Sequence, residues 1–142
     1  MPFDKAKFEA DLRQFTGTEH YYRFGLSPNV LCTDGVKFVA DECQSFWLLD
    51  AIASYYIPIG PLHEAMKRDE RLQNMQFWNL KTDLEARTAV LTCRPDAGAT
   101  PVVVQEFTTD FPLESIDIWC GILDYNEATG VKKWAIYLPS EH

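Results

Sequence analysis

The sequence has no apolar stretch long enough to cross a bilayer. Its longest apolar run, residues 45–57, is interrupted by Asp50 and followed by Pro58, whereas a spanning helix needs about 20 apolar residues. The first residues also lack the basic start and apolar core of a signal peptide. We therefore expect no membrane partner and a cytoplasmic location.

Cysteine and histidine are too scattered along the chain for a metal centre. The four cysteines form no Cys-x-x-Cys pair, which argues against a structural zinc site, and a cytoplasmic chain rarely keeps disulfides. We interpret the cysteines as small buried core residues, and we predict no metal site and no cofactor. The residues concerned are Cys32, Cys43, Cys93, Cys120, His20, His63 and His142.

The signatures of common enzymes are missing as well. The sequence contains no glycine-rich phosphate loop, no Gly-x-Ser-x-Gly elbow and no His-Glu-x-x-His pair. We therefore expect a non-catalytic protein. The alternative is a small carboxylate-dependent hydrolase, whose acid would be Asp50, or Glu19 together with His20.

The composition is that of one folded domain. Hydrophobic residues make up 46% and aromatic residues 13% of the 142 residues, enough to bury a core, so disorder is not expected. Low-complexity segments, internal repeats and linkers rich in Pro, Gly or Ser are all absent from the sequence. We therefore predict a single domain over residues 1–142.

Basic residues are scarce, and their absence from one region is the first indication of function. Lys and Arg number 13 against 21 Asp and Glu, for a net charge of −8, which disfavours direct binding to nucleic acid. Residues 95–131 contain no Lys or Arg at all. Such an acidic surface attracts a basic protein partner, although solubility alone also accounts for it. The predicted partner-binding acids are Asp110, Glu114, Asp117, Asp124 and Glu127.

The strongest helix signal in the chain lies at residues 45–57. Asp41 and Gln44 have the spacing of a capping box before it, and Pro58 ends the pattern. Because nearly every position is apolar, we predict a buried helix around which the domain is built. Asp50 is then either exposed or held by hydrogen-bond donors, and a functional acid is the other interpretation.

A hairpin is predicted directly before this helix. Residues 30–33 and 36–40 are β-prone and are separated by Asp34 and Gly35. An Asp-Gly pair suits the positive φ angles of a tight hairpin turn. The two strands would therefore lead into the core helix.

The amino-terminal region is predicted to form an amphipathic helix followed by an exposed polar cluster. Phe8, Leu12 and Phe15 follow helical spacing over residues 4–15. The cluster after it offers acid–base groups, an anion contact and stacking surfaces, although neighbouring residues of a strand point to opposite faces. It supplies the secondary site candidates Glu19, His20, Tyr22 and Arg23.

The second half of the chain changes to β-prone segments separated by turns. A short helix is expected at 61–73, and residues 115–123, which fit both a strand and a helix, are taken as a strand because their isoleucines alternate. We predict an α+β domain: a mostly antiparallel β-sheet, made of a hairpin and a meander, with one buried core helix and an N-terminal amphipathic helix. The strands expected after the hairpin are 76–81, 88–93, 102–108, 115–123 and 133–138.

Six short segments in a fixed order resemble a known family. Together they are similar to a family of small single-domain bacterial proteins of uncharacterised function, which occur as accessory genes in bacteria and mobile elements. The resemblance runs from about residue 14 to residue 142 and implies no catalytic role, and the longer turn at 126–130 departs from the family pattern. The segments are Phe-Thr-Gly-Thr-Glu at 15–19, Thr-Asp-Gly-Val-Lys at 33–37, Trp-Leu-Leu-Asp-Ala-Ile-Ala at 47–53, Phe-Trp-Asn-Leu at 77–80, Thr-Asp-Phe-Pro-Leu at 109–113 and Leu-Pro-Ser-Glu at 138–141.

These observations favour a non-catalytic acidic protein-binding module. One specific form is an anti-CRISPR-like inhibitor from a mobile element or phage, which occupies the basic nucleic-acid site of a host defence complex by imitating phosphate charge. The alternatives are the carboxylate-dependent hydrolase and a homo-oligomeric structural protein. Four tryptophans and an unprotected sheet edge would suit self-association.

Overall fold

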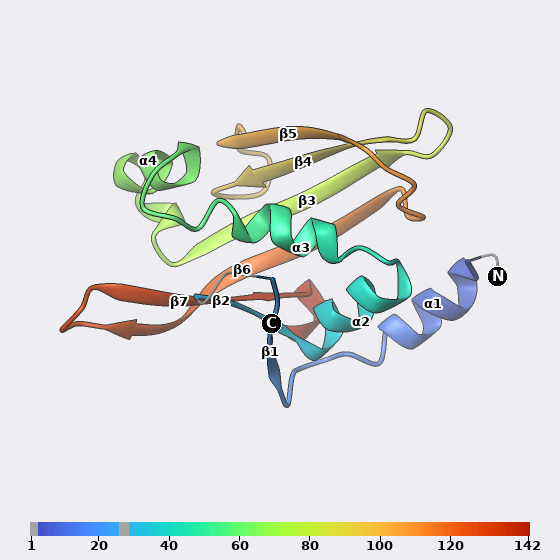
Figure 1. Cartoon of the computed structure of the whole chain (residues 1–142), viewed down its shortest axis with the longest axis horizontal. Coiled ribbons are helices and arrows are strands. Elements are labelled where there is room, and N and C mark those ends of the chain that lie inside the picture. The colour runs from blue at the N-terminus through green and yellow to red at the C-terminus, as the bar shows by residue number, and fades with distance from the viewer. Residues whose placement is uncertain (1–2, 26–28) are drawn as a thin grey trace.

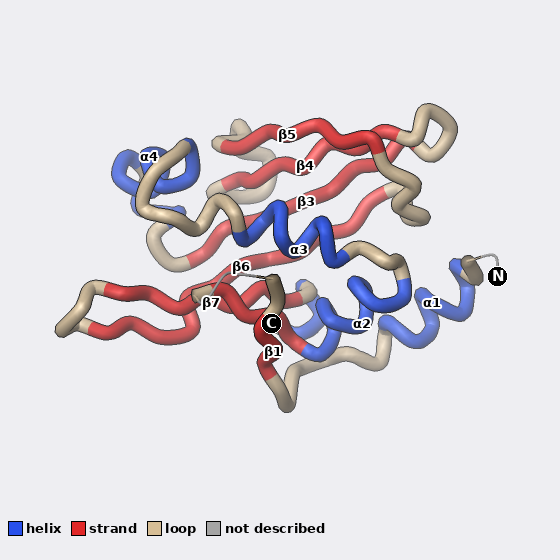
Figure 2. Tube along the Cα trace, in the orientation of Figure 1, coloured by secondary structure: helices blue, strands red, loops and turns tan. Residues whose placement is uncertain are grey.

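Four α-helices lie against one face of a β-sheet or at its end in the computed structural model, which describes residues 3–25 and 29–142 (Figure 1; Figure 2). The helices are α1 (Lys5–Leu12), α2 (Asp34–Glu42), α3 (Phe46–Ala53) and α4 (Pro61–Arg68), with the 3₁₀ turns η1 (Glu70–Leu72) and η2 (Pro139–Glu141). The strands are β1 (Tyr21–Arg23), β2 (Val30–Thr33), β3 (Met75–Asp83), β4 (Thr88–Arg94), β5 (Val103–Thr108), β6 (Ser115–Asn126) and β7 (Val131–Tyr137). In this described part of the chain, no helix has the length and apolarity to cross a membrane.

The strands of the described residues form one seven-stranded sheet in the order β1-β2-β7-β6-β3-β4-β5. Strand β2 pairs in parallel with β7, and each of the other neighbouring pairs is antiparallel. The predicted α+β class with a mostly antiparallel sheet is confirmed. The meander β3-β4-β5 is also confirmed, in antiparallel register throughout.

The two faces of the sheet differ in what covers them. On β3, Trp78 and Leu80 are buried while Phe77 and Asn79, which point the other way, are half-exposed. We call the buried side the inner face and the other the outer face. Helices α2 and α3 lie over the inner face, and α1 packs beside α2 beyond the ends of the strands (Figure 1). The outer face therefore remains free of these three helices.

The buried core helix is confirmed as α3, which lies over the inner face. Its side chains Leu48, Leu49 and Ile52 are fully buried, and Leu48 and Ile52 pack against residues of β3, β4 and β6 that include Trp78 and Leu91. Burying side chains of this size stabilises the fold by about 2 kcal/mol each. Helix α3 thus packs its apolar side chains directly on the inner face.

The predicted ends of the core helix are wrong. Asp41 lies in the last turn of α2, and Gln44 adopts a left-handed φ of 50° between the two helices, so they form no capping box. The backbone N–H of Ser45 donates to the carbonyl of Ala40, which turns the chain into α3. The helix then ends at Ala53, several residues before the proline that was expected to stop it.

The predicted hairpin over 30–40 is also wrong, because β2 leads directly into α2. The Thr33 hydroxyl accepts a hydrogen bond from the N–H of Val36 at 3.4 Å and caps the helix. Val36, Val39 and Ala40 are buried and follow the three-to-four spacing of a helix face. The Asp-Gly pair therefore occupies a first helical turn, where an acid suits the helix dipole.

The N-terminal amphipathic helix is confirmed as α1, although it is shorter than expected. The Asp4 carboxylate accepts from the N–H of Lys7 at 3.0 Å, and Phe8 is buried and stacks on Phe38. The helix ends at Leu12 instead of continuing to the predicted boundary. Most of this short helix is solvated and its inner side packs against α2.

Strands β6 and β7 continue beyond the sheet as a two-stranded arm. Within residues 3–25 and 29–142, β3 pairs with β6 as far as Gly121 and β2 pairs with β7 from Trp134 onward, so the ladder pairs recorded for residues 123–133 are with one another. Figure 1 shows this hairpin projecting at the left. We call residues 123–133 the arm. The prediction of a strand at 115–123 is confirmed and extended, since β6 continues to Asn126.

Candidate functional site

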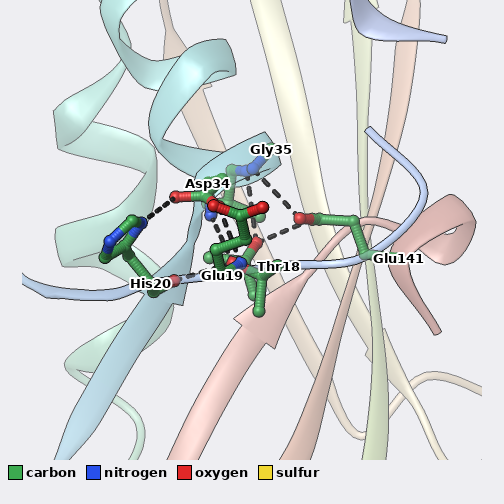
Figure 3. Close-up of polar contacts among 8 residues, drawn as sticks. Thr18, Glu19, His20, Asp34, Gly35 and Glu141 are labelled. Atoms are coloured by element: carbon green, nitrogen blue, oxygen red, sulfur yellow. Dashed lines mark hydrogen bonds and ion pairs between the residues drawn. The ribbon is translucent and has the colours of Figure 1, made fainter. Parts of the chain in front are cut away.

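A network of hydrogen bonds joins the start of α2 to residues near the carboxyl end of the sequence (Figure 3). The Glu141 carboxylate accepts from the Thr33 hydroxyl at 2.7 Å, from the N–H of Gly35 at 3.1 Å and from the N–H of Leu138 at 2.9 Å. Thr33 and Glu141 are 108 positions apart in sequence. The carboxylate therefore stabilises the N-terminal turn of α2, where negative charge is favoured.

Gly35 makes this approach of Glu141 possible. A Cβ at this position would lie 2.6 Å from Oε1 of Glu141 and 2.7 Å from a methyl group of Leu138. Neither contact is tolerated without movement of the neighbour. The glycine is thus required by packing at a helix start, and not by a turn.

Asp34 organises the polar cluster that precedes β1. Its backbone N–H donates to the Thr18 hydroxyl at 3.0 Å, and its carboxylate accepts from the N–H of Glu19 at 2.9 Å. The Nδ1 atom of His20 lies 3.8 Å from Oδ1 of the same carboxylate (Figure 3). The sequence predicted a relation between His20 and Glu19, whereas the structure brings His20 toward Asp34.

The same carboxylate affects the titration of its neighbours. The N–H of Glu19 and the hydroxyl of Tyr22 stabilise the charged form of Asp34 and lower its pKa, although desolvation opposes them. The hydrogen bond to Asp34 in turn raises the pKa of Tyr22. The Lys37 amine lies 5.4 Å from the centre of the Tyr22 ring, and Asp41 at 2.8 Å raises the pKa of that lysine.

This cluster is poorly arranged for acid–base catalysis. The His20 side chain is 67% exposed, and 3.8 Å exceeds the separation of about 3 Å at which a proton is transferred directly. Arg23 is exposed on the short strand β1 and pairs through its backbone with Leu31. The secondary candidates therefore share one end of the sheet but do not converge on one point.

Asp50 lies apart from this cluster, on the exposed side of α3. Its carboxylate packs against Gly25, where a Cβ would overlap Oδ1. Gly25 also has a φ of 53°, which favours glycine. Asp50 is thus exposed, which agrees with its interpretation as part of the scaffold.

The five predicted partner-binding acids are all exposed, but they occupy different parts of the molecule. Asp110 lines a hollow beside α1, and Glu114 lines a second one next to the same helix. Asp117 accepts from the Asn79 amide at 2.9 Å on the outer face. Asp124 and Glu127 lie in the arm, where Asp124 faces Lys133 across the ladder.

The hollow beside α1 has a volume of about 570 Å³ and is lined by several carboxylates. Lys7 is also part of its wall, and its amine lies 3.4 Å from the Asp11 carboxylate. Across residues 3–25 and 29–142, His, Cys, Asp and Glu side chains form no group of three or more that is arranged to hold a metal ion. The hollow is therefore an acidic depression without a coordination geometry. Its acidic lining residues are Asp4, Asp11, Glu42 and Asp110.

A third concave region lies on the outer face, between β1, β6, β7 and η2. Its volume is about 240 Å³. The absence of a side chain at Gly121 leaves room for the Tyr137 ring, which would lie 3.3 Å from a Cβ there. We call this region the outer groove. It is lined by Thr18, Tyr21, Thr33, Gly121, Ile122, Leu123, Ala135, Tyr137, Glu141 and His142.

Aromatic rings continue from the outer groove across the outer face. Tyr137 stacks on His142 at a centroid distance of 5.8 Å, and both rings contact Trp119 edge-on. Trp119 also meets Phe77 edge-on at 5.1 Å. Edge-to-face contacts of this kind hold the rings in defined orientations. Sequence analysis missed this cluster, because its members come from three strands and the residue after η2.

The prediction that the four cysteines are buried is confirmed. Burial raises the pKa of Cys32, Cys43 and Cys93 to about 12, and it also raises that of Cys120. These thiols are therefore neutral near pH 7 and poor nucleophiles. They belong to the core and not to a reactive site.

Comparisons with known proteins place the chain in a family but add no activity. Neither the curated proteins nor the solved structures contain a match to it. A family model matches residues 6–142, which is nearly the whole chain and includes both α2 and the arm. The chain belongs to DUF6876, a family of unknown function.

Proposed function

We propose that this protein is a non-catalytic binding module that recognises a protein partner through the arm and the adjoining outer face. The observation that carries the proposal is the exposure of large apolar side chains on a hairpin whose strands, among the described residues, pair with each other. Leu123, Tyr125 and Val131 are 39%, 50% and 42% exposed. Tyr125 and Val131 point to opposite sides of the arm, because Tyr125 pairs with Lys132 and Val131 with Asn126. Exposed apolar side chains on a projecting hairpin are typical of interaction sites.

The aromatic cluster beside the arm supports the same surface. Trp119 and Tyr137 are half-exposed on the outer face, and their ring contacts fix them in place. Aromatic residues are enriched at the centres of protein interfaces, because they bury much area at little cost in side-chain entropy. Leu123 lines the outer groove and would join the aromatic cluster to the arm, whereas Tyr125 shares the Lys132 amine with the buried Trp134 and lies on the opposite side.

The net charge of −8 favours a basic partner. Complementary charge speeds association and disfavours acidic competitors. A narrower proposal makes the protein an inhibitor from a bacterial mobile element, in which the five exposed acids imitate nucleic-acid phosphates. Lack of Lys and Arg over 95–131 supports it, but the acids are spread out: Asp117 and Asp124 are about 23 Å apart along the strand.

The hydrolase alternative has less geometric support than binding does. Its acid–base candidates are exposed, and His20 is 3.8 Å from the carboxylate it faces.

Self-association has one observation in its favour: strand β5 is a sheet edge with Val104 59% exposed. Sedimentation over a range of concentrations tests it, and a constant monomer mass would remove it.

The experiment that tests the binding proposal is affinity capture with the full chain from its native cell, at low and high salt. The double variant Tyr125→Ser, Val131→Ser removes apolar surface from the arm. The matched control Val104→Ser removes a similarly exposed side chain at the far edge of the sheet. We expect the arm variant to lose at least about tenfold of the captured partner and the control to retain it.

Capture that is equal for the wild type and the arm variant would remove the arm from the interface. To test phosphate imitation separately, the five acids are changed to their amides. That narrower proposal predicts loss of a salt-sensitive partner, and an unchanged affinity for basic proteins would contradict it.

A further inference from the structure

We propose that the outer groove binds an arginine side chain of the protein partner, with Glu141 as its carboxylate contact. The inference rests on the proposed binding function and adds the chemistry that the surface recognises. It draws on three observations: a carboxylate fixed in position, aromatic walls on both sides, and the charge of the lining.

The Glu141 carboxylate is held rigidly and still has acceptor capacity. It accepts three hydrogen bonds, from Thr33, Gly35 and Leu138. An ionised carboxylate offers about four acceptor positions. One position on Oε2 thus remains for a donor from outside, among the contacts of the described residues. Because the carboxylate is already ordered, a ligand would not bear the entropy cost of fixing it.

The walls of the groove suit a planar cation. Tyr21 is 47% exposed on one side, and the stacked pair Tyr137 and His142 lies on the other. A guanidinium group stacks on aromatic faces and donates hydrogen bonds at its edge, whereas an ammonium group is a strongly hydrated point charge. An arginine that enters between the rings would reach Glu141 with its edge.

The charge of the lining selects a cation over an anion. Among the described residues of the groove wall, Glu141 is the side chain that carries a full charge near pH 7, with histidine taken as neutral. The nearest lysine in the ladder, Lys133, faces Asp124. A phosphate or carboxylate ligand would therefore meet a negative group and no positive one in the groove.

The test uses synthetic pentapeptides with a central arginine, lysine or citrulline between glycine and serine residues. Binding to the full chain is followed by NMR chemical shifts and by Trp119 fluorescence. We expect saturable binding of the arginine peptide at or below about 1 mM, with shifts confined to the groove. Citrulline keeps the shape and loses the charge, so its peptide should bind at least about tenfold more weakly.

Two variants locate the site. Tyr21→Ser should weaken the arginine peptide about fivefold, because one stacking face is lost, whereas Leu84→Ser, which removes a similarly exposed side chain outside the groove, should leave it unchanged. Glu141→Gln should weaken it about tenfold or more. Since Glu141 also supports α2, circular dichroism must show that this last variant is folded.

The inference is overturned if the arginine peptide gives no saturable signal, if citrulline or lysine binds equally well, or if Tyr21→Ser and Leu84→Ser behave alike. These results leave the proposed function separable from it. Partner capture that depends on the arm but not on Tyr21 would keep the binding module and discard the arginine site. If partner capture depended on neither the arm nor Tyr21, both the binding module and the arginine site would be discarded.

Discussion

The start of α2 and the arm both contain polar side chains, but the protein uses them in opposite ways. At the start of α2, the polar groups are paired within the chain. The Glu141 carboxylate accepts from the Thr33 hydroxyl and the N–H of Gly35, and the Asp34 carboxylate accepts from the N–H of Glu19. In the arm, Asp124 is exposed on β6 and Glu127 is exposed in the turn that follows it. Groups satisfied inside the molecule maintain the fold, whereas those exposed on the arm are the ones that we propose meet a partner.

The difference extends to what each region should tolerate. Substitution near Glu141 disturbs contacts between distant parts of the chain, whereas substitution in the arm changes a surface. Stability measurements should therefore separate the two regions clearly.

Gly35→Ala should destabilise the protein by about 3 kcal/mol, because the new Cβ overlaps Glu141 and Leu138. The sign of this change in unfolding free energy is informative, because replacing glycine by alanine in a helix ordinarily stabilises it by about 0.5–1 kcal/mol. Urea unfolding measures the change. Gly17→Ala is the matched control, as nothing lies within 4 Å of its Cβ, and an equal loss there would contradict a role of close packing.

Thr33→Val should cost about 1–2 kcal/mol of unfolding free energy. The substitution removes the cap on the N–H of Val36 and one donor to Glu141 while it keeps the side-chain shape. Thr108→Val, at an exposed position of β5, serves as the control. Equal midpoints in urea for the two variants would show that the network contributes nothing.

Asp34→Asn should reduce the pH dependence of stability on the acidic side. The folded pKa of Asp34 is lowered from 3.8, so its contribution is complete above about pH 4–5 and is lost as the pH falls through the folded value. The wild type should therefore exceed the variant in stability near pH 6, and the two should converge toward pH 2. If the unfolding free energies of the wild type and the variant changed in parallel between pH 6 and pH 2, Asp34 would not be the source of this pH dependence.

The double arm variant Tyr125→Ser, Val131→Ser should change the unfolding free energy by no more than about 1 kcal/mol. Both side chains are half-exposed on strands outside the main sheet. Its effect should instead appear in partner capture. A large loss of stability would mean that the arm supports the fold. The arm and the start of α2 would then not differ in their contribution to stability.

Local patterns in the sequence were sufficient for much of the fold. The helical spacing of Phe8 and Leu12 and the alternation along β3 to β6 depend on neighbours within a few residues, so they identify α1 and the meander correctly. The Asp-Gly pair misled because its turn preference competes with the buried helical spacing of Val36 and Val39. There, tertiary burial and a threonine cap decided the outcome.

The candidate site was much less accessible to such reasoning. Asp34, Glu141 and Tyr137 approach one another only after strands β2 and β7 have paired, and no local spacing indicates it. The acids of 95–131 were recognised as a group by sequence alone, yet folding distributes them over three regions. The bulge between Ile122 and Asp124 also changes which acids share a face.

The position of β7 in the sheet has a consequence for how the chain is made. This late strand lies between β2 and β6, so it joins the amino-terminal strands to the rest of the sheet. Until it has emerged from the ribosome, the sheet consists of two separate pieces, each with an open edge that invites mispairing. Completion of the fold must therefore wait for residues 131–137, and folding should be slow for a protein of this size.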